Sequence, residues 1–287
     1  MTPSPRDGLV TDVDQLIESG DLLGLGAAAD ERRRMMHGDR TTFVRVQEVS
    51  VSPMAAQVKV LSGAGELRIV GDPETSREAV RVTEGVVALS DGTPVTGFVL
   101  DGLAMLCGHD PETLRDLLID LRGAGLAMMS ALRADTPRAH EWLDVSGEAG
   151  IDIARLVVEQ PTTDDGVSLC YQVASWGASA AHVHTFAPLA RSTDTRVTTG
   201  YDDGRRVALA RLLVDNIDSI QVDWGRHGPK LAQVALIFGA DDVDGVASTD
   251  SLDNGPRRTP LEEIHRNIVA AALVPVQRNG CFKTRDV

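Results

Sequence analysis

Residues 223–245 read DWGRHGPKLAQVALIFGADDVDG, a stretch in which several specific features follow one another without a gap. The run LAQVALIF is apolar on most sides, which is typical of a buried helix. Gly228-Pro229 predicts a turn before it. We expect Asp241 to Asp244 to form a solvated, Asp-rich turn after it, because the run lacks the terminal Glu of a calcium-binding EF-hand loop.

Outside this stretch the chain repeats one unit: a short β-branched run, a loop with Gly, Pro or Asp, and an amphipathic helix. Such alternation predicts an α/β fold in which helices cover a parallel sheet. No Gly-x-Gly-x-x-Gly follows the first strand, so a (βα) barrel, complete or partial, is favoured over an open dinucleotide-binding sheet. We expect strands at 43–51, 66–71, 95–101, 125–131, 153–159, 181–187 and 217–223.

The barrel is expected to occupy residues 43–245. An N-terminal helical segment, 1–42, precedes it, and a C-terminal loop, helix and tail, 246–287, pack on it. Asp110, Thr136 and Thr259 each stand before a Pro and an amphipathic run, as N-cap residues do.

Composition excludes several classes of function. The net charge of −14 argues against nucleic acid and anionic membrane surfaces as partners, since both attract clustered Lys and Arg. No 18-residue apolar run is present, and the start MTPSPRDGLVTDVDQ lacks the pattern of a signal peptide, so a cytoplasmic location is expected. Three scattered cysteines do not form a disulfide framework or a metal-ligand spacing.

Two segments carry a family resemblance. Residues 201–245, which begin YDDGRRVALARLL and end with the stretch quoted above, and residues 21–45, DLLGLGAAADERRRMMHGDRTTFVR, resemble the radical SAM enzymes of menaquinone biosynthesis. The similarity is to aminofutalosine synthase first, then to dehypoxanthine futalosine cyclase and the synthases of the F420 precursor. This resemblance implies a barrel of radical SAM type.

The chain departs from that family where its cofactor binds. The family has a Cys-x₃-Cys-x₂-Cys loop after the first strand, because three thiolates hold a [4Fe–4S] cluster. Here no cysteine precedes Cys107, and Gly71-Asp72-Pro73 replaces a family Gly-Gly. Glu159-Gln160-Pro161-Thr162-Thr163 and Ser130-Ala131-Leu132-Arg133 also differ from the family pattern. We therefore expect no [4Fe–4S] cluster and no other cofactor, and S-adenosylmethionine binding is doubtful.

Candidate ligand-binding residues follow from the expected strand ends, because functional groups of parallel barrels lie at the carboxyl ends of the strands. These are Asp72, Asp101, Arg133, Glu159, His184 and Arg226, which has His227 beside it. Arg45 and Glu48 join them from the first strand, since Arg can bind a carboxylate ligand through two hydrogen bonds. The alternative for each residue is a solvated loop position or an ordinary ion pair.

His182 and His184 lie two apart on an expected strand, so both imidazoles can point to one face and share a metal ion. Such a site needs a third ligand, for which Glu159, Asp101 and His227 are candidates. The alternative, which we favour, is that the histidines are structural and that no metal binds.

These observations favour a barrel without a cluster, related to aminofutalosine synthase, that binds a nucleoside or an aromatic carboxylate. Its role would be non-radical and linked to the futalosine route to menaquinone, and whether it is an enzyme stays open. The alternative is a non-catalytic subunit that partners an active radical SAM paralogue. An active radical enzyme that uses Cys107, Cys170 and Cys281 is disfavoured, because these cysteines lie on separate expected elements.

Overall fold

Eight parallel strands close into a barrel in the computed structural model, which describes residues 13–52, 59–160, 166–192, 197–249 and 261–284. Each strand pairs with the next along the chain, and β1 pairs with both β2 and β8, which closes the ring. The strands of the ring are β1 (Arg40–Ser50), β2 (Glu66–Val70), β3 (Val95–Val99), β4 (Met128–Arg133), β5 (Ile153–Val158), β6 (Val183–Ala190), β7 (Ser219–Asp223) and β8 (Asp242–Ala247). The predicted (βα) barrel is thus confirmed, in its complete form.

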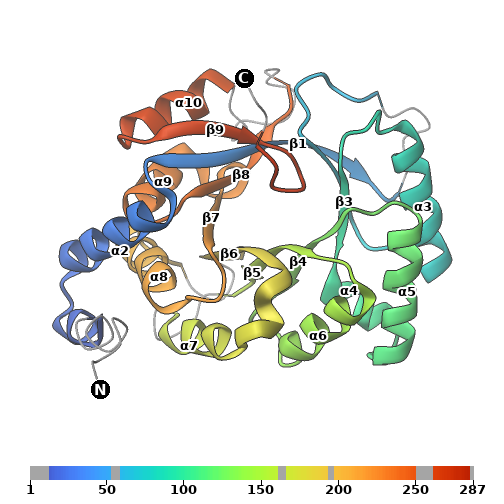
Figure 1. Ribbon diagram of the computed structural model, residues 1–287, viewed down its shortest axis with the longest axis horizontal. Coiled ribbons are helices and arrows are strands. Elements are labelled where there is room, and N and C mark those ends of the chain that lie inside the picture. Colours follow the sequence, from blue (N-terminus) through green and yellow to red (C-terminus); the bar gives the residue numbers. More distant parts are fainter. Residues whose placement is uncertain (1–12, 53–58, 161–165, 193–196, 250–260, 285–287) are drawn as a thin grey trace.

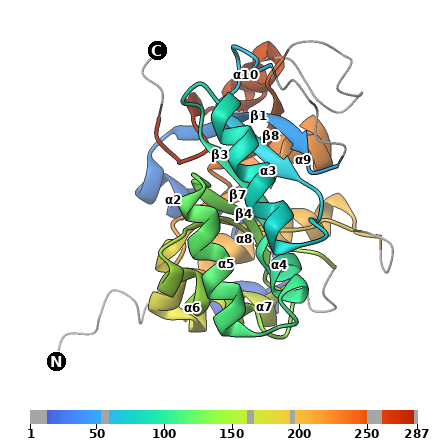
Figure 2. The ribbon, with the colours of Figure 1, turned by 90° about the vertical axis from the view of Figure 1, so that its right-hand side faces the viewer.

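Helices surround the ring of strands on the outside (Figure 1). They are α2 (Leu22–His37), α3 (Ser76–Leu89), α4 (Leu100–Leu106), α5 (Pro111–Gly123), α6 (Ala139–Ala149), α7 (Val167–Ser175), α8 (Gly200–Leu213), α9 (Trp224–Ile237) and α10 (Leu261–Ala270). Figure 2 shows α3 and α5 side by side on one flank of the barrel. Within the described part of the chain, no helix is both long enough and apolar enough to cross a membrane.

Helix boundaries follow the local sequence where a side chain can cap them. Asp110 accepts a hydrogen bond from Thr113 N, so α5 begins at Pro111 as predicted. The predicted cap at Thr136 is wrong, because α6 begins at Ala139 and has no side-chain cap. Thr259 lies outside the described residues.

The stretch that follows β7 is helical, but its backbone departs from helical geometry at Gly228 (φ 79°, ψ 168°). This confirms the predicted turn at Gly228-Pro229, since a positive φ suits Gly and the following Pro cannot donate to the previous turn. Ala232, Ala235 and Leu236 are fully buried, as predicted for the apolar run.

The predicted Asp-rich turn is wrong. Asp242 and Asp244 are fully buried in β8, whose register with β1 sets Thr42 opposite Asp242. The physical reason is that buried arginines from other strands bind both carboxylates, which makes burial of these acids tolerable. β8 therefore completes the barrel, so β7 is not its last strand.

A ninth strand, β9 (Val274–Arg278), was not expected in the C-terminal tail. β9 pairs in parallel with the first half of β1, from Arg40 to Val44, whereas β2 pairs with the second half of β1. β9 thus pairs with the part of β1 that precedes its pairing with β2. Beyond it, Gly280 N donates to Gly65 O at 3.0 Å, which holds residues 279–284 at the start of β2.

Candidate functional site

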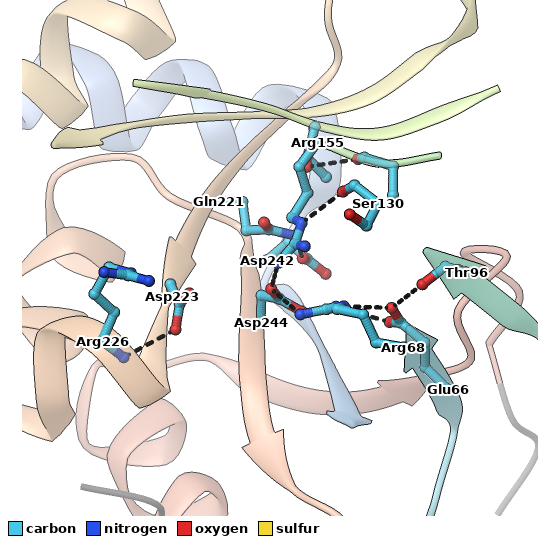
Figure 3. Close-up of polar contacts among 12 residues, drawn as sticks. Glu66, Arg68, Thr96, Ser130, Arg155, Gln221, Asp223, Arg226, Asp242 and Asp244 are labelled. Carbon is cyan, nitrogen blue, oxygen red and sulfur yellow. Dashed lines mark hydrogen bonds and ion pairs between the residues drawn. The ribbon is translucent and has the colours of Figure 1, made fainter. Parts of the chain in front are cut away.

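Charged side chains from different strands meet inside the barrel. Asp244 on β8 accepts hydrogen bonds of 2.7 and 3.0 Å from Arg68 on β2, and Arg68 also donates to Glu66 at 2.7 and 3.0 Å. Thr96 on β3 donates to Glu66 at 2.6 Å. Figure 3 shows Arg68 between the two carboxylates. Most of the N–H donors of Arg68 are thereby used within the barrel.

Arg155 on β5 also reaches the carboxylate of Asp244 (Figure 3). Its Nη1 forms an ion pair with Asp244, and its Nε donates to Ser130 O at 3.0 Å. Burial alone would raise the pKa of Asp244, but Arg155 and Arg68 hold that pKa well below its usual range. Asp244 is therefore an anion at every pH near neutrality, fixed between two cations.

A second buried carboxylate lies closer to the amino ends of the strands. Asp242 accepts hydrogen bonds of 2.6 and 2.7 Å from Arg278 of β9 and one of 2.6 Å from Gln221 of β7. Thr42 of β1 also donates to it. These bonds tie the C-terminal strand to the barrel interior.

Above this network, at the carboxyl ends of the strands, a cavity of about 210 Å³ opens. We call it the arginine cavity, since Arg68, Arg155, Arg191 and Arg226 all line it. Its acidic lining residues are Glu48, Asp72 and Asp223. Guanidinium groups bind carboxylates and phosphates in a planar, two-point geometry. The cavity thus has the chemistry to bind an anionic group, and its carboxylates can accept hydrogen bonds from hydroxyl or ammonium groups.

Arg191 stands out among these arginines. It follows β6 directly, and 26 % of its side chain is exposed. Within the described ranges, its guanidinium donates no hydrogen bond, and its one ion pair is with Glu159, Nε to Oε2 at 4.0 Å. Burial, with the like charges of Arg155 and Arg226, lowers the pKa of Arg191 to about 10. Arg191 is thus a weakly compensated cation whose donors remain available.

A second cavity, also about 210 Å³, adjoins the first. Asp72, Val99 and Arg191 line both cavities, so Arg191 stands at their boundary. The remaining lining of the second cavity is mixed: Gly102, Met105 and Val157 are uncharged, and Arg133 and Glu159 are charged. It can hold an uncharged or apolar part of a ligand beside an anionic group.

The structure brings five of the eight candidate residues to these cavities. Glu48, Asp72 and Arg226 line the arginine cavity, and Asp72, Arg133 and Glu159 line the second one. Asp101 lines neither cavity, and its buried carboxylate forms an ion pair with Arg133. Arg45 is also buried, and its Nε donates to Ala247 O at 2.9 Å.

The predicted position of His184 is wrong. β6 begins at Val183 and ends at Ala190, so His184 lies near the amino end of its strand, away from the cavities. Its ring stacks on Phe282 with centroids 4.5 Å apart, and its Nε2 lies 3.3 Å from Asp152. His182 ends the 3₁₀ helix before β6 rather than sharing its strand. His227 contacts the backbone carbonyls of Asp223 and Ala190 at 3.2 and 3.3 Å.

The cysteines of the chain do not fit a cluster-binding loop. Cys107 follows α4 directly, Cys170 is buried in α7, and Cys281 follows β9. None of the three lines the arginine cavity or the second cavity. Across the described ranges, no group of three or more His, Cys, Asp or Glu side chains is arranged to hold a metal ion.

Sequence reasoning missed the residues that dominate this site: Arg68, Arg155, Arg191, Asp223 and Asp244. One signal was available in the sequence, since Arg68 and Arg155 lie inside expected apolar strands, where an unpaired charge is costly. Arg191 was missed because the sixth strand was expected to end at 187 rather than at Ala190.

Similarity to known proteins confirms the resemblance to aminofutalosine synthase and to the synthases of the F420 precursor that was predicted from the sequence. The chain is 26 % identical to a 5-amino-6-(D-ribitylamino)uracil–L-tyrosine 4-hydroxyphenyl transferase of Methanosphaerula palustris, over 83 % of this chain and 82 % of that protein. It is 36 % identical to the aminodeoxyfutalosine synthase of Thermus thermophilus, over 30 % of this chain and 24 % of the synthase. The enzyme of that name from Streptomyces coelicolor is 37 % identical, over 31 % of this chain and 24 % of the enzyme. The chain is thus a homologue of both kinds of enzyme.

Solved structures agree on the fold. Methylornithine synthase superposes with a TM-score of 0.64 at 14 % identity, over 92 % of this chain and 93 % of that one. The hydrogenase maturase HydG gives a TM-score of 0.61 at 15 % identity, over 91 % of this chain and 70 % of that one. No family model matches the sequence. The barrel of this chain therefore has the same fold as these two proteins.

Proposed function

We propose that this chain binds a small organic anion in the mouth of its barrel, in a role that does not use radical chemistry. The observation that carries this proposal is Arg191, a largely buried cation at the boundary of two cavities whose guanidinium donates no hydrogen bond to a described residue. A buried cation without a close anion is costly, so an anionic ligand would stabilise it. Arg155 supports the same anion, because within the described structure its Nη2 donates no hydrogen bond.

The proposed ligand is a nucleoside or an aromatic carboxylate related to the futalosine route to menaquinone. The two adjoining cavities, of about 210 Å³ each, together reach the volume that is typical of small-molecule sites. Relatedness supports an aromatic carboxylate, since the transferase homologue carries L-tyrosine in its name and two other homologues are aminodeoxyfutalosine synthases. The non-radical role rests on the cysteines, which lie on separate elements and away from the cavities.

Binding of benzoate, measured by its effect on the melting temperature, tests the proposal. A ligand that binds only the folded state raises the melting temperature as its concentration rises. We expect benzoate to do so for the wild type and not for Arg191→Gln, whereas the neutral isostere benzamide has little effect on either protein. Arg81→Gln is the matched control, because the Arg81 side chain is 59 % exposed and lies on α3, away from both cavities.

Equal effects of benzoate and benzamide on the wild type would contradict the proposal. So would an Arg191→Gln variant that responds to benzoate like the wild type. Mass spectrometry of small molecules that co-purify with the wild type is an independent test of the natural ligand. We expect it to find an anion that Arg191→Gln fails to retain.

A further inference from the structure

Glu159 is the only ion-pair partner of Arg191 in the described parts of the chain, and its position is fixed by the backbone. Its N–H donates to both carboxylate oxygens of Asp135, at 3.1 and 3.0 Å. Its carbonyl accepts a hydrogen bond of 2.9 Å from Ser192 N, and Val158 O accepts one of 2.9 Å from Arg191 N. The main chains at Glu159 and Arg191 are therefore held side by side.

This framework keeps the two charges at an intermediate distance. At 4.0 Å the pair is too long for a hydrogen bond, yet the carboxylate still attracts the guanidinium. Glu159 lines only the second cavity, whereas Arg191 lines both. Asp223 in the arginine cavity also attracts Arg191, without forming an ion pair with it. The attraction of Glu159 acts in a different direction, toward the second cavity and away from Arg155 and Arg226.

We infer that Glu159 is the resident counter-ion of Arg191 and competes for it with the anionic group of the ligand. This inference rests on the proposed function, since it assigns to one residue of that site a role opposed to binding. An anion in the arginine cavity gains the hydrogen bonds of Arg191 and Arg155 but also replaces the attraction of Glu159. Glu159 thus lowers the affinity for any anion and favours ligands that contact both arginines.

Arg133 does not relieve this competition. Its guanidinium forms an ion pair with the buried Asp101, and Arg133 N donates to the same carboxylate at 3.3 Å. The Glu159 carboxylate, whose side chain is 34 % exposed, thus faces one cation that already has a close partner and one, Arg191, that does not. Removing the charge of Glu159 therefore takes away the one ion pair that Arg191 forms with a described residue, whereas Arg133 keeps its ion pair with Asp101.

The test measures benzoate affinity by equilibrium dialysis at low ionic strength, with Glu159→Gln as the informative variant. We expect Glu159→Gln to lower the dissociation constant of benzoate roughly two- to fivefold, the range that a partly exposed ion pair commands. Arg191→Gln should raise it at least about tenfold. In Arg191→Gln the further change Glu159→Gln should not alter the dissociation constant of benzoate, because the guanidinium for which benzoate and the Glu159 carboxylate compete is gone. Glu141→Gln on α6, whose carboxylate pairs with Arg138, is the matched control.

The two hypotheses fail in different ways. If the wild type binds benzoate and Glu159→Gln binds it equally or more weakly, Glu159 is not a competitor, and the proposed function stands. An equal gain from Glu159→Gln in the presence and absence of Arg191 would also overturn the inference, since the effect would not pass through Arg191. If neither the wild type nor Glu159→Gln binds benzoate, the proposed function and the inference fall together.

Discussion

Arg68 and Asp244 meet inside the barrel through two hydrogen bonds of 3.0 and 2.7 Å, although 176 residues separate them in the chain. Both side chains are buried, and burial alone would favour their neutral forms. Arg68 comes from β2 and Asp244 from β8, which lie on either side of β1 in the sheet. The pair therefore links the last strand of the barrel to its beginning.

The first prediction concerns the stability of this link. Asp244→Asn keeps the size of the side chain but leaves Arg68 and Arg155 without their shared anion. Breaking a buried ion pair by removing one partner costs about 3 to 5 kcal/mol of unfolding free energy. Urea denaturation measures this loss. Asp116→Asn on α5, whose carboxylate is 73 % exposed, should change the free energy by less than about 0.5 kcal/mol, and an equally small loss for Asp244→Asn would contradict the assignment.

The pH dependence of unfolding provides a second prediction. The pKa of Asp244 in the folded protein lies well below its ordinary value of 3.8, because Arg155 and Arg68 outweigh the effect of burial. A depressed pKa contributes stability that is fully present above the unfolded-state pKa and is lost as the pH falls toward the folded-state pKa. The wild type should therefore lose more unfolding free energy than Asp244→Asn between about pH 4 and pH 2. Parallel curves would contradict this prediction.

Sequence patterns predicted the strands whose burial follows from their own composition. Seven of the eight barrel strands were expected, because runs such as FVRVQEVSV and IARLVV are rich in β-branched and apolar residues. β8 was missed because Asp-Asp-Val-Asp-Gly has the composition of a turn, and only the arginines of β2, β5 and β9 make its burial possible. β9 was missed because Pro275 argues against a strand, although an edge strand tolerates it.

The candidate site depended on strand ends, and there small errors had large consequences. The expected strand 181–187 ends three residues before Ala190. For this reason His184 was expected at the carboxyl end of the sixth strand, where the structure has Arg191. Asp72, Glu159 and Arg226 follow strands whose ends were close to correct, and these residues do line the cavities. That Arg155 and Arg226 lie near enough to Arg191 to lower its pKa is a property of the closed barrel, which no local pattern encodes.

A third prediction concerns the family cofactor. Anaerobic reconstitution with iron and sulfide should leave the protein without the broad visible absorption of a [4Fe–4S] cluster, since such a cluster needs several thiolates within reach of one iron–sulfur core. The three cysteines of the chain lie on separate elements, and burial raises the pKa of both Cys107 and Cys281. About one cluster per chain, lost in Cys107→Ala, would contradict this prediction and restore radical chemistry as a candidate function.

The last prediction separates a structural from a metal-binding role for His184. Its imidazole stacks on Phe282 with an interplanar angle of 6°, and the guanidinium of Arg278 lies 3.9 Å from the centroid of the same Phe282 ring. Arg278 in turn binds Asp242, so His184 supports the segment that follows β9 at the amino ends of the strands. His184→Ala should cost about 1 kcal/mol of unfolding free energy, the typical value of an aromatic pair. Phe282→Ala should cost more because it also loses the contact with Arg278, and the double variant should cost less than the sum of the two single changes, because they share one contact.

Purified wild type and His184→Ala should both contain far less than one equivalent of zinc, iron or manganese. Stoichiometric metal in the wild type that His184→Ala releases would overturn the structural role, because a metal site loses most of its affinity when one of three protein ligands is removed.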